Sequence, residues 1–265
     1  MGILNVTPDS FSDGGAFFCK EDAYRHSMRM VEDGADIIDI GGESTRPGSQ
    51  YVDQDEELRR IMPVIESLVG RIPVPISVDT RRAAVARAAL EAGCRMVNDV
   101  SACRDPEMPG VVREFRVPIV VMHMKGDPDS MQESPHYDDV VKEVCAFLAE
   151  RAKFLERQGI DSDMIIVDPG IGFGKRFRDN LDLLKSIDTI RTLGYPVTIG
   201  ASRKRFLGEL LETDPNERLS GNLAVAAWCY KTNVEVIRVH DVKETAGLLK
   251  VLDAIEHPKE YSASW

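Results

Sequence analysis

The chain has 265 residues, of which 43% are hydrophobic and 29% are charged, and its formal net charge is −11 at pH 7. This composition is typical of a globular enzyme and excludes a chain that is disordered throughout. The negative charge argues against nucleic acid or an anionic membrane surface as a partner, because both attract broad basic patches. No apolar run is long enough to predict a membrane-spanning helix. The five cysteines are odd in number and lack C-x-x-C spacing, which favours a reduced, cytoplasmic compartment.

Short runs rich in β-branched residues alternate with longer amphipathic stretches along the whole chain. The runs predict eight strands, at residues 3–6, 36–40, 76–79, 96–98, 119–123, 165–168, 197–200 and 236–239. Amphipathic stretches such as 22–34, 81–93 and 180–194 predict helices, each closed by a glycine. Regular alternation predicts a parallel sheet. Eight units favour a closed (β/α)8 TIM barrel, a single domain over residues 1–265, above the alternative of an open doubly wound sheet.

Polar residues stand where the predicted strands end. In a barrel the C-terminal ends of all strands meet at the face that carries the active site. Single residues such as Asp99 are equally well explained as caps of the following helix. Capping does not explain Lys204, Arg238 and His240. Arg238 and His240 are two residues apart and therefore share one side of a strand, which predicts an anionic ligand. The residues at these ends are Asn5, Asp39, Glu43, Asp79, Asn98, Asp99, His123, Asp168, Ser202, Lys204, Arg238 and His240.

Three other patterns carry less information. The glycines of "DPGIGFGK" match no phosphate-loop spacing, so this loop either lets backbone approach a flat ligand or is a tight turn without ligand contact. The histidines show no zinc spacing, and His123 is either a satisfied polar residue or a catalytic one. The run "KRFRD" at 175–179 is interpreted as a solvated loop.

Two loops rich in Gly, Ser, Pro and Asp follow the first two predicted strands. Loops of such length in a compact barrel are often functional lids, so we expect residues 7–18 and 43–53 to be mobile without ligand. Asn5 precedes the first loop and Arg46 lies within the second.

Together these motifs resemble those of the dihydropteroate synthases, folate-pathway enzymes that sulfonamides inhibit. The resemblance rests on "ILNVTPDSFSDGG", "DIGGESTRPG", "VDT", "ND", "VVMHMKGDP", "DPGIGFGK", "SRK" and "RVHDV", in that order, and covers nearly the whole chain. It implies a homodimeric transferase that joins 4-aminobenzoate to 6-hydroxymethyl-7,8-dihydropterin diphosphate. The products implied are 7,8-dihydropteroate and diphosphate, with Mg²⁺ as cofactor.

The resemblance also implies roles for individual residues. The pterin pocket would consist of Asp79, Asn98, Met122, Asp168, Phe173 and Lys204. The diphosphate would lie against the catalytic residues Arg46, Arg238 and His240, beside Lys204, with magnesium near Asn5. The aminobenzoate pocket would use Thr45, Pro47, Lys204 and the residue after it, Arg205, where members of the family often carry serine.

Two alternatives remain at this stage. A barrel that binds methyl-folates and passes the methyl group to a corrinoid protein shares the carboxylate and Asn pocket, but "STRPG", "SRK" and "RVH" speak against it. A pterin-binding protein that has lost catalysis is the other, and the presence of Asn5, Arg46, Lys204 and Arg238 speaks against that.

Overall fold

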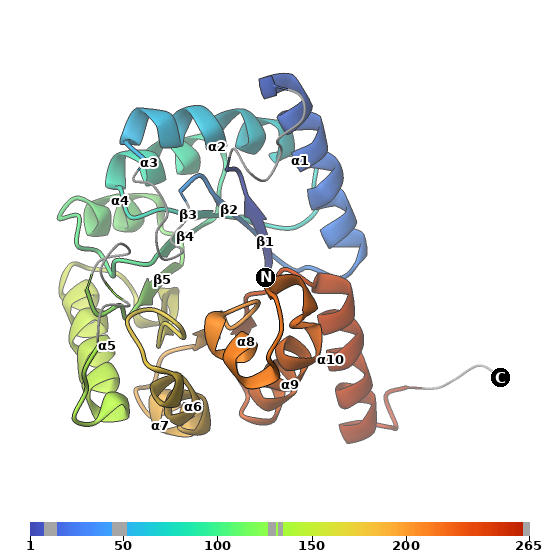
Figure 1. The fold of residues 1–265 in the computed structure, drawn as a ribbon. Coiled ribbons are helices and arrows are strands. Elements are labelled where there is room, and N and C mark those ends of the chain that lie inside the picture. The colour runs from blue at the N-terminus through green and yellow to red at the C-terminus, as the bar shows by residue number, and fades with distance from the viewer. Residues whose placement is uncertain (8–14, 44–51, 127–130, 132–134, 262–265) are drawn as a thin grey trace.

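The computed structural model describes residues 1–7, 15–43, 52–126, 131 and 135–261, with residues 15–20 described by their backbone. Its strands form a ring, and its helices surround that ring (Figure 1). The described residues contain eight strands: β1 (Gly2–Asn5), β2 (Ile38–Gly41), β3 (Ile76–Asp79), β4 (Met96–Asp99), β5 (Ile119–Met122), β6 (Ile165–Asp168), β7 (Thr198–Ile199) and β8 (Val236–Ile237).

The ring closes through two short parallel contacts. Strands β1 to β6 pair in chain order as one parallel sheet, and β7 pairs with β8. Parallel bridges join Val167 to Val197 and Gly2 to Val239, so β7 follows β6 and β8 returns to β1. This closure confirms the predicted barrel over the open sheet, because an open sheet would leave β1 and β8 at opposite edges.

The helices follow the strands around the outside of the ring. They are α1 (Gly15–Glu32), α2 (Gln54–Leu68), α3 (Ala83–Ala92), α4 (Met108–Phe115), α5 (Val140–Arg157), α6 (Phe177–Lys185), α7 (Ile187–Arg191), α8 (Arg205–Leu211), α9 (Leu219–Lys231) and α10 (Val242–Glu256), with 3₁₀ turns η2 (Ser162–Met164) and η3 (Pro215–Glu217). Local signals set several ends. Asp53 and Asp139 cap α2 and α5 by accepting from Glu56 and Lys142 backbone N–H groups, and Gly93 ends α3 at φ 122°.

One predicted helix is in fact two. The amphipathic stretch 180–194 is interrupted at Ser186, whose φ of −104° and ψ of 23° leave the helical region. The break separates α6 from α7, although the apolar spacing continues across it: Leu183, Leu184, Ile187 and Ile190 are all buried. The spacing of apolar residues thus predicts the buried face correctly but does not predict the interruption at Ser186.

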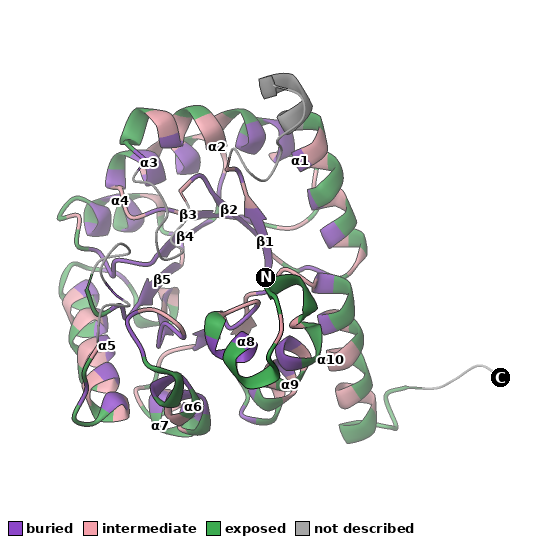
Figure 2. Cartoon of the chain, in the orientation of Figure 1, coloured by how far each residue is buried: buried purple, intermediate pink, exposed green. Residues whose placement is uncertain are grey.

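Each strand contributes alternate residues to two different interiors. Ile38, Ile40, Ile76 and Val78 belong to the apolar core between the ring and its helices. The residues between them point the other way, into the barrel, because successive side chains of a strand alternate. That inner set is polar on neighbouring strands: Asp39 is level with Ser77, and Asp79 with Asn98. Figure 2 shows most strand residues as buried and the outer helix faces as exposed.

Candidate active site

The centre of the barrel mouth is a buried cation held between carboxylates. Arg238, directly after β8, donates from Nε to Asp39 Oδ2 (2.6 Å) and from Nη2 to Asp79 Oδ2 (2.8 Å). Asn98 of β4 also donates to Asp39 Oδ2, at 3.0 Å. Four strands thus supply one network, and the predicted site residues Asp79, Asn98 and Arg238 are brought together in it.

Burial and charge change the acid–base properties of this network. Burial alone would lower the pKa of the Arg238 guanidinium, but the charges of Asp39 and Asp79 raise it above its ordinary value. Burial raises the pKa of Asp79 to about 7, against the opposing effect of Arg238. The site therefore holds a permanent cation next to a carboxyl group that gains a proton easily.

A second cation stands next to an aromatic ring. Lys204 precedes α8, and its Nζ lies 3.8 Å from the centroid of the Phe173 ring. Burial lowers the pKa of Lys204 to about 7, with Asp168 opposing the shift. Burial also raises the pKa of Asp168, at the end of β6, although the Gly170 N–H and Lys204 both favour its ionised form. Lys204, Asp168 and Phe173 thus form a unit at the mouth.

An apolar surface adjoins this unit. Met122 packs with Val100, Met124 and Met131 in a small buried cluster separate from the main core, and Phe173 packs against it. The family resemblance assigned Met122 and Phe173 to the pterin pocket, and the structure brings both to this cluster. A planar heterocycle would find apolar contact and a charged group here.

The glycine loop after β6 is packed backbone against backbone. Gly170 has φ +68° and Gly174 φ +62°, and a Cβ on either would overlap a carbonyl oxygen of the preceding loop, that of His123 or Lys125. A Cβ on Gly172 would lie 2.9 Å from Cδ of Lys204. The glycines are therefore required by the protein's own packing, and the loop's backbone lies next to the Lys204 side chain.

The interpretation of residues 175–179 as a solvated loop is wrong, because α6 begins at Phe177 and two of the five side chains are buried. Lys175 and Asp179 are each only 3% exposed. The Lys175 Nζ contacts three acceptors: His123 Nδ1 at 3.0 Å, the His123 carbonyl at 3.3 Å and the Phe173 carbonyl at 2.9 Å. Burial, followed by the charge of Lys175, lowers the pKa of His123 to about 3, so His123 is a neutral, satisfied acceptor. These contacts tie the glycine loop to β5.

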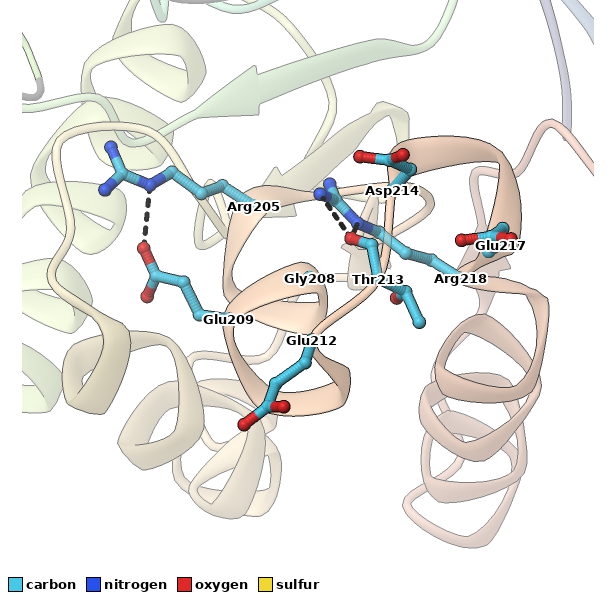
Figure 3. A pocket seen from close by; sticks show the side chains of 8 residues that line it. All are labelled: Arg205, Gly208, Glu209, Glu212, Thr213, Asp214, Glu217 and Arg218. Carbon is cyan, nitrogen blue, oxygen red and sulfur yellow. Dashed lines mark hydrogen bonds and ion pairs between the residues drawn. The ribbon is translucent and has the colours of Figure 1, made fainter.

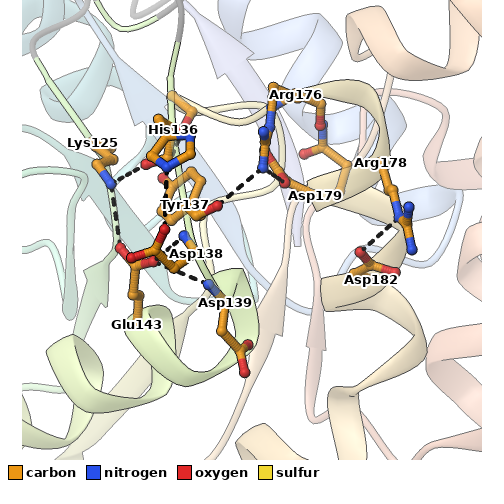
Figure 4. Close-up of polar contacts among 12 residues, drawn as sticks. Lys125, His136, Tyr137, Asp138, Asp139, Glu143, Arg176, Arg178, Asp179 and Asp182 are labelled. Carbon is orange, nitrogen blue, oxygen red and sulfur yellow. Dashed lines mark hydrogen bonds and ion pairs between the residues drawn. The ribbon is translucent and has the colours of Figure 1, made fainter.

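Further polar contacts secure the outer side of the same loop (Figure 4). The Tyr137 hydroxyl donates to the Gly174 carbonyl at 2.7 Å, and Lys125 lies 4.0 Å from the Tyr137 ring centroid. Arg176 points toward Asp179 and binds both of its carboxylate oxygens at 2.8 Å. The loop is thus held by the connection between β5 and α5 and by the start of α6.

His240 lies beyond Arg238 and contacts the loop after β7. Its Nδ1 is 3.0 Å from Ser202 Oγ, and its backbone N–H donates to the same oxygen at 3.2 Å. Asn222 of α9 contacts Ser202 and also Asp241. Ser202 was a strand-end candidate, whereas no sequence signal identified Asn222, which lies in the first turn of an apolar helix.

The three consecutive cations of "SRKR" have three different surroundings. Arg203, at φ +60°, binds Asp241 at 2.6 Å, while Lys204 faces Phe173. Arg205 points toward Glu209 at 2.7 Å, with 77% of its side chain exposed (Figure 3). It lines a surface pocket of about 360 Å³ with Gly208, Glu209, Glu212, Thr213, Asp214, Glu217 and Arg218. This pocket includes none of the barrel-mouth carboxylates.

Arg218 braces the loop that carries Lys204. It donates to the carbonyls of Arg203 and Lys204, at 2.8 and 3.2 Å, and to that of Thr213. Its guanidinium lies against Gly208, where a side chain would displace it. A single arginine thereby fixes the entry to α8.

Asp99 has a structural role in the turn after β4. It is fully buried and accepts from the backbone N–H groups of Ser101 (2.7 Å) and Cys103 (2.8 Å) and from the Ser101 hydroxyl (2.6 Å). These bonds hold the turn after β4. The interpretation of Asp99 as a cap of the following helix is wrong, because α4 begins only at Met108 and its N-cap residue is Glu107.

Three predicted site residues, Thr45, Arg46 and Pro47, lie outside the described residues, as does most of both expected lids. The described residues on either side of the second expected lid meet at the carboxylate of Glu43. Glu43 accepts from the Val52 N–H (3.3 Å), Arg81 (2.9 Å) and Arg82 (3.0 Å). Glu43 and Val52, the described residues before and after segment 44–51, are therefore held beside the end of β3.

Asn5 is the last residue of β1. It pairs with Gly41 of β2, which in turn pairs with Asp79 of β3, so the three residues lie at the same level of the barrel. Asn5 is half-buried at the same mouth. Within the described residues, no three His, Cys, Asp or Glu side chains are grouped so that they could hold a metal by themselves.

Comparisons with known proteins identify the family of this chain. The family described as pterin binding enzyme matches residues 1–240. The dihydropteroate synthase of Bacillus subtilis (strain 168) is 45% identical over 256 residues, covering 96% of this chain and 87% of that protein. Two solved structures of Xanthomonas albilineans dihydropteroate synthase each match 97% of this chain and 92% of their own chain. The one with 4-aminobenzoic acid is 48% identical with a TM-score of 0.91, and the one in complex with 7,8-dihydropteroate is 46% identical with a TM-score of 0.88.

The chain belongs to the pterin-binding enzyme family. Within that family its similarities are to the dihydropteroate synthases, transferases of folate biosynthesis, and the predicted fold, family and activity class are confirmed. No described helix is long and apolar enough to cross a membrane.

Proposed function

We propose that the barrel mouth joins 4-aminobenzoate to 6-hydroxymethyl-7,8-dihydropterin diphosphate and releases diphosphate. A new C–N bond forms between the aniline nitrogen and the pterin methylene carbon. The C–O bond to diphosphate breaks, and its electron pair leaves with the diphosphate. The nitrogen then loses one proton to water. The observation that carries this proposal is the convergence of Arg238, Lys204 and His240 on a mouth that also holds carboxylates suited to a pterin.

The pterin is proposed to lie across the unit formed by Asp168, Lys204 and Phe173. A pterin presents adjacent N–H donors that one carboxylate accepts as a pair, and Asp168 is the carboxylate beside the ring-contact residues. Phe173 and the Met122 cluster supply apolar contact to its faces. Asn98 and Asp79 extend the polar edge, and the raised pKa of Asp79 allows it to donate or accept there.

The diphosphate is proposed to lie against Arg238, His240 and Arg46. Within the described residues, two of the five N–H groups of Arg238 are bound, to Asp39 and Asp79, and a guanidinium can bind an anion with the others. Hydrogen bonds to charged groups contribute about 1.5–3 kcal/mol each, so a few of them on the departing oxygen can lower the barrier by several powers of ten. The main task of catalysis is to stabilise the negative charge that develops on the leaving oxygen of the diphosphate.

Magnesium is proposed to bind through the diphosphate, with Asn5 as the protein oxygen. Mg²⁺ keeps several waters and takes few protein ligands in addition to substrate phosphates, so a single carboxamide at the mouth fits that pattern. When bound, the ion would supply positive charge to the phosphate oxygens. Asn5 would orient those oxygens toward Arg238.

The aminobenzoate is proposed to bind between Thr45, Pro47, Lys204 and Arg205. The Arg205 guanidinium is exposed and paired with Glu209, so a benzoate carboxylate can compete for it at the protein surface. An aniline nitrogen is neutral and nucleophilic near pH 7, so the reaction requires no strong general base in the site.

We further propose one domain over residues 1–265, a cytoplasmic location and a homodimer. Contact between the first and last strands supports the single domain. The odd cysteine count supports the location. Exposed apolar side chains of α9 and α10, Trp228, Val251 and Ile255, support an interface there. Light scattering during size-exclusion chromatography tests the dimer: we expect twice the chain mass of 29.5 kDa.

The experiment that tests the proposed reaction is diphosphate release from the dihydropterin diphosphate, with and without 4-aminobenzoate and Mg²⁺. Release coupled one to one with dihydropteroate formation supports the full assignment. Pterin binding without release in the complete mixture would overturn the reaction while leaving the pterin pocket in place.

A further inference from the structure

His240 is held at one ring nitrogen by a serine from the neighbouring strand end. Ser202 Oγ lies 3.0 Å from His240 Nδ1, and it also accepts the backbone N–H of His240 at 3.2 Å. Ser202 is 8% exposed, so water competes little for these bonds. The position of the Ser202 hydroxyl hydrogen decides whether Nδ1 of the His240 ring accepts or donates the hydrogen bond between them.

The surroundings of Ser202 settle that position. A hydroxyl has one hydrogen to donate and two lone pairs that accept. One lone pair accepts the His240 backbone N–H and the other accepts the Asn222 amide nitrogen at 3.4 Å. Both partners are donors. The hydroxyl hydrogen is therefore left for His240 Nδ1, which must act as the acceptor.

The orientation of the Asn222 amide is fixed independently. Its Oδ1 accepts the backbone N–H of Arg203 at 3.0 Å, and its Nδ2 donates to Asp241 Oδ2 at 2.9 Å. A flipped amide would place its NH₂ group against an N–H donor and its oxygen against a carboxylate. Asp241 is itself held by Arg203 Nη2 at 2.6 Å. The direction of every hydrogen bond from Arg203 to His240 is thereby determined.

We propose that Ser202 and Asn222 are positioning residues that hold His240 as the neutral tautomer with its hydrogen on Nε2. In this form the other ring nitrogen is an N–H donor, which stabilises an anionic oxygen. The opposite tautomer would present a lone pair to that oxygen. A protonated ring would donate from both nitrogens and leave the Ser202 hydrogen without its acceptor. The benefit to catalysis rests on the proposed diphosphate position, whereas the tautomer does not.

The tautomer can be read directly by NMR. The full chain is prepared with ring-¹⁵N histidine, and long-range ¹H–¹⁵N correlations are recorded without ligand at mildly alkaline pH. Loss of one set of signals in His240→Asn assigns the residue. We expect a protonated Nε2 and an unprotonated Nδ1. A hydrogen on Nδ1 of the wild-type protein overturns the proposal, whether or not any variant folds.

Variants connect the tautomer to turnover. Ser202→Ala is expected to give mixed tautomers and to lower kcat about tenfold to hundredfold, as on removal of the hydrogen-bond partner that orients a metal-ligating histidine, with KM for 4-aminobenzoate unchanged. Ser202→Thr keeps the hydroxyl and should restore both readouts. Ser67→Ala is the matched control, because it removes another buried serine hydroxyl, bound to the Val64 carbonyl at 2.7 Å. Ser67→Ala should change neither the tautomer of His240 nor kcat.

The outcomes separate this proposal from the proposed function. A wild-type protein that forms dihydropteroate but carries the hydrogen on Nδ1 overturns only the tautomer proposal. A protein with the Nε2 hydrogen that forms no dihydropteroate overturns the proposed reaction and keeps the tautomer. Ser202→Ala with unchanged tautomer and unchanged kcat would overturn the positioning role.

Discussion

Replacing Arg238 by methionine should destabilise the fold more than any surface arginine replacement. Arg238 is the partner of Asp39, whose side chain is fully buried, and of Asp79, whose side chain is 11% exposed. Methionine keeps much of the side-chain length and removes the charge. Both carboxylates would then lose a hydrogen-bonded cation in a site that water reaches poorly.

The expected magnitude follows from the cost of leaving a buried charge without its partner. Removing one member of a buried ion pair typically costs about 3–5 kcal/mol. Asp79 adds a dependence on pH. Its pKa is about 7 with Arg238 in place, and removing the cation raises it further. Above about pH 7, Asp79 is ionised in the folded wild type but still protonated in the folded variant. Asp79 of either unfolded chain is ionised there, so only the folding of the variant requires uptake of a proton. The deficit relative to wild type therefore grows as pH rises, by up to about 1.4 kcal/mol per pH unit.

The assay is urea unfolding of the wild type and Arg238→Met at about pH 6 and about pH 8.5. Arg87→Met is the matched control, because Arg87 also binds a carboxylate through two nitrogens, that of Glu114 at 2.7 and 3.0 Å, but on an exposed surface. Its unfolding midpoint should hardly change. In the double variant Arg238→Met with Asp39→Asn, removal of one stranded charge should recover part of the loss.

Two results would refute this reasoning. The first is a loss in Arg238→Met no larger than that in Arg87→Met. The second is a deficit that stays constant, or shrinks, between the two pH values. Either would mean that the carboxylates of the barrel mouth are not held by Arg238 in the folded protein.

Three further predictions concern the mouth. Lys204→Ala should abolish turnover, and wild-type kcat/KM should fall above about pH 7 as Lys204, with its pKa of about 7, loses its charge; normal kcat/KM in the variant would reject this role. Gly170→Ala should cost at least about 1–2 kcal/mol in thermal unfolding, because φ is +68° and a Cβ meets the His123 carbonyl, whereas Gly110→Ala, in open space on α4, should not destabilise. Arg205→Ala should raise KM for 4-aminobenzoate about two- to fivefold, as expected for an exposed ion pair; an unchanged KM removes Arg205 from that pocket.

Sequence patterns alone determined much of this protein. Strand-like runs followed by amphipathic stretches predicted the eight β/α units, because burial on both sides of a parallel strand requires short apolar runs. The rule that strand ends share one face then grouped Asp79, Asn98, Asp168 and Arg238. The motifs at these ends identified the family. Each of these inferences depends on residues close together in the chain.

The tertiary structure decided the partners and surroundings of those residues. Arg238 and Asp39 are 199 positions apart, and closure of the ring places one beside the other. Lys175 has the sequence surroundings of a surface lysine and is buried only because the glycine loop folds back onto β5. Asn222 reaches Ser202 because α9 packs over the loop after β7. Hydrogen-bond direction and burial are properties of contacts between distant segments, and local sequence patterns do not encode those contacts.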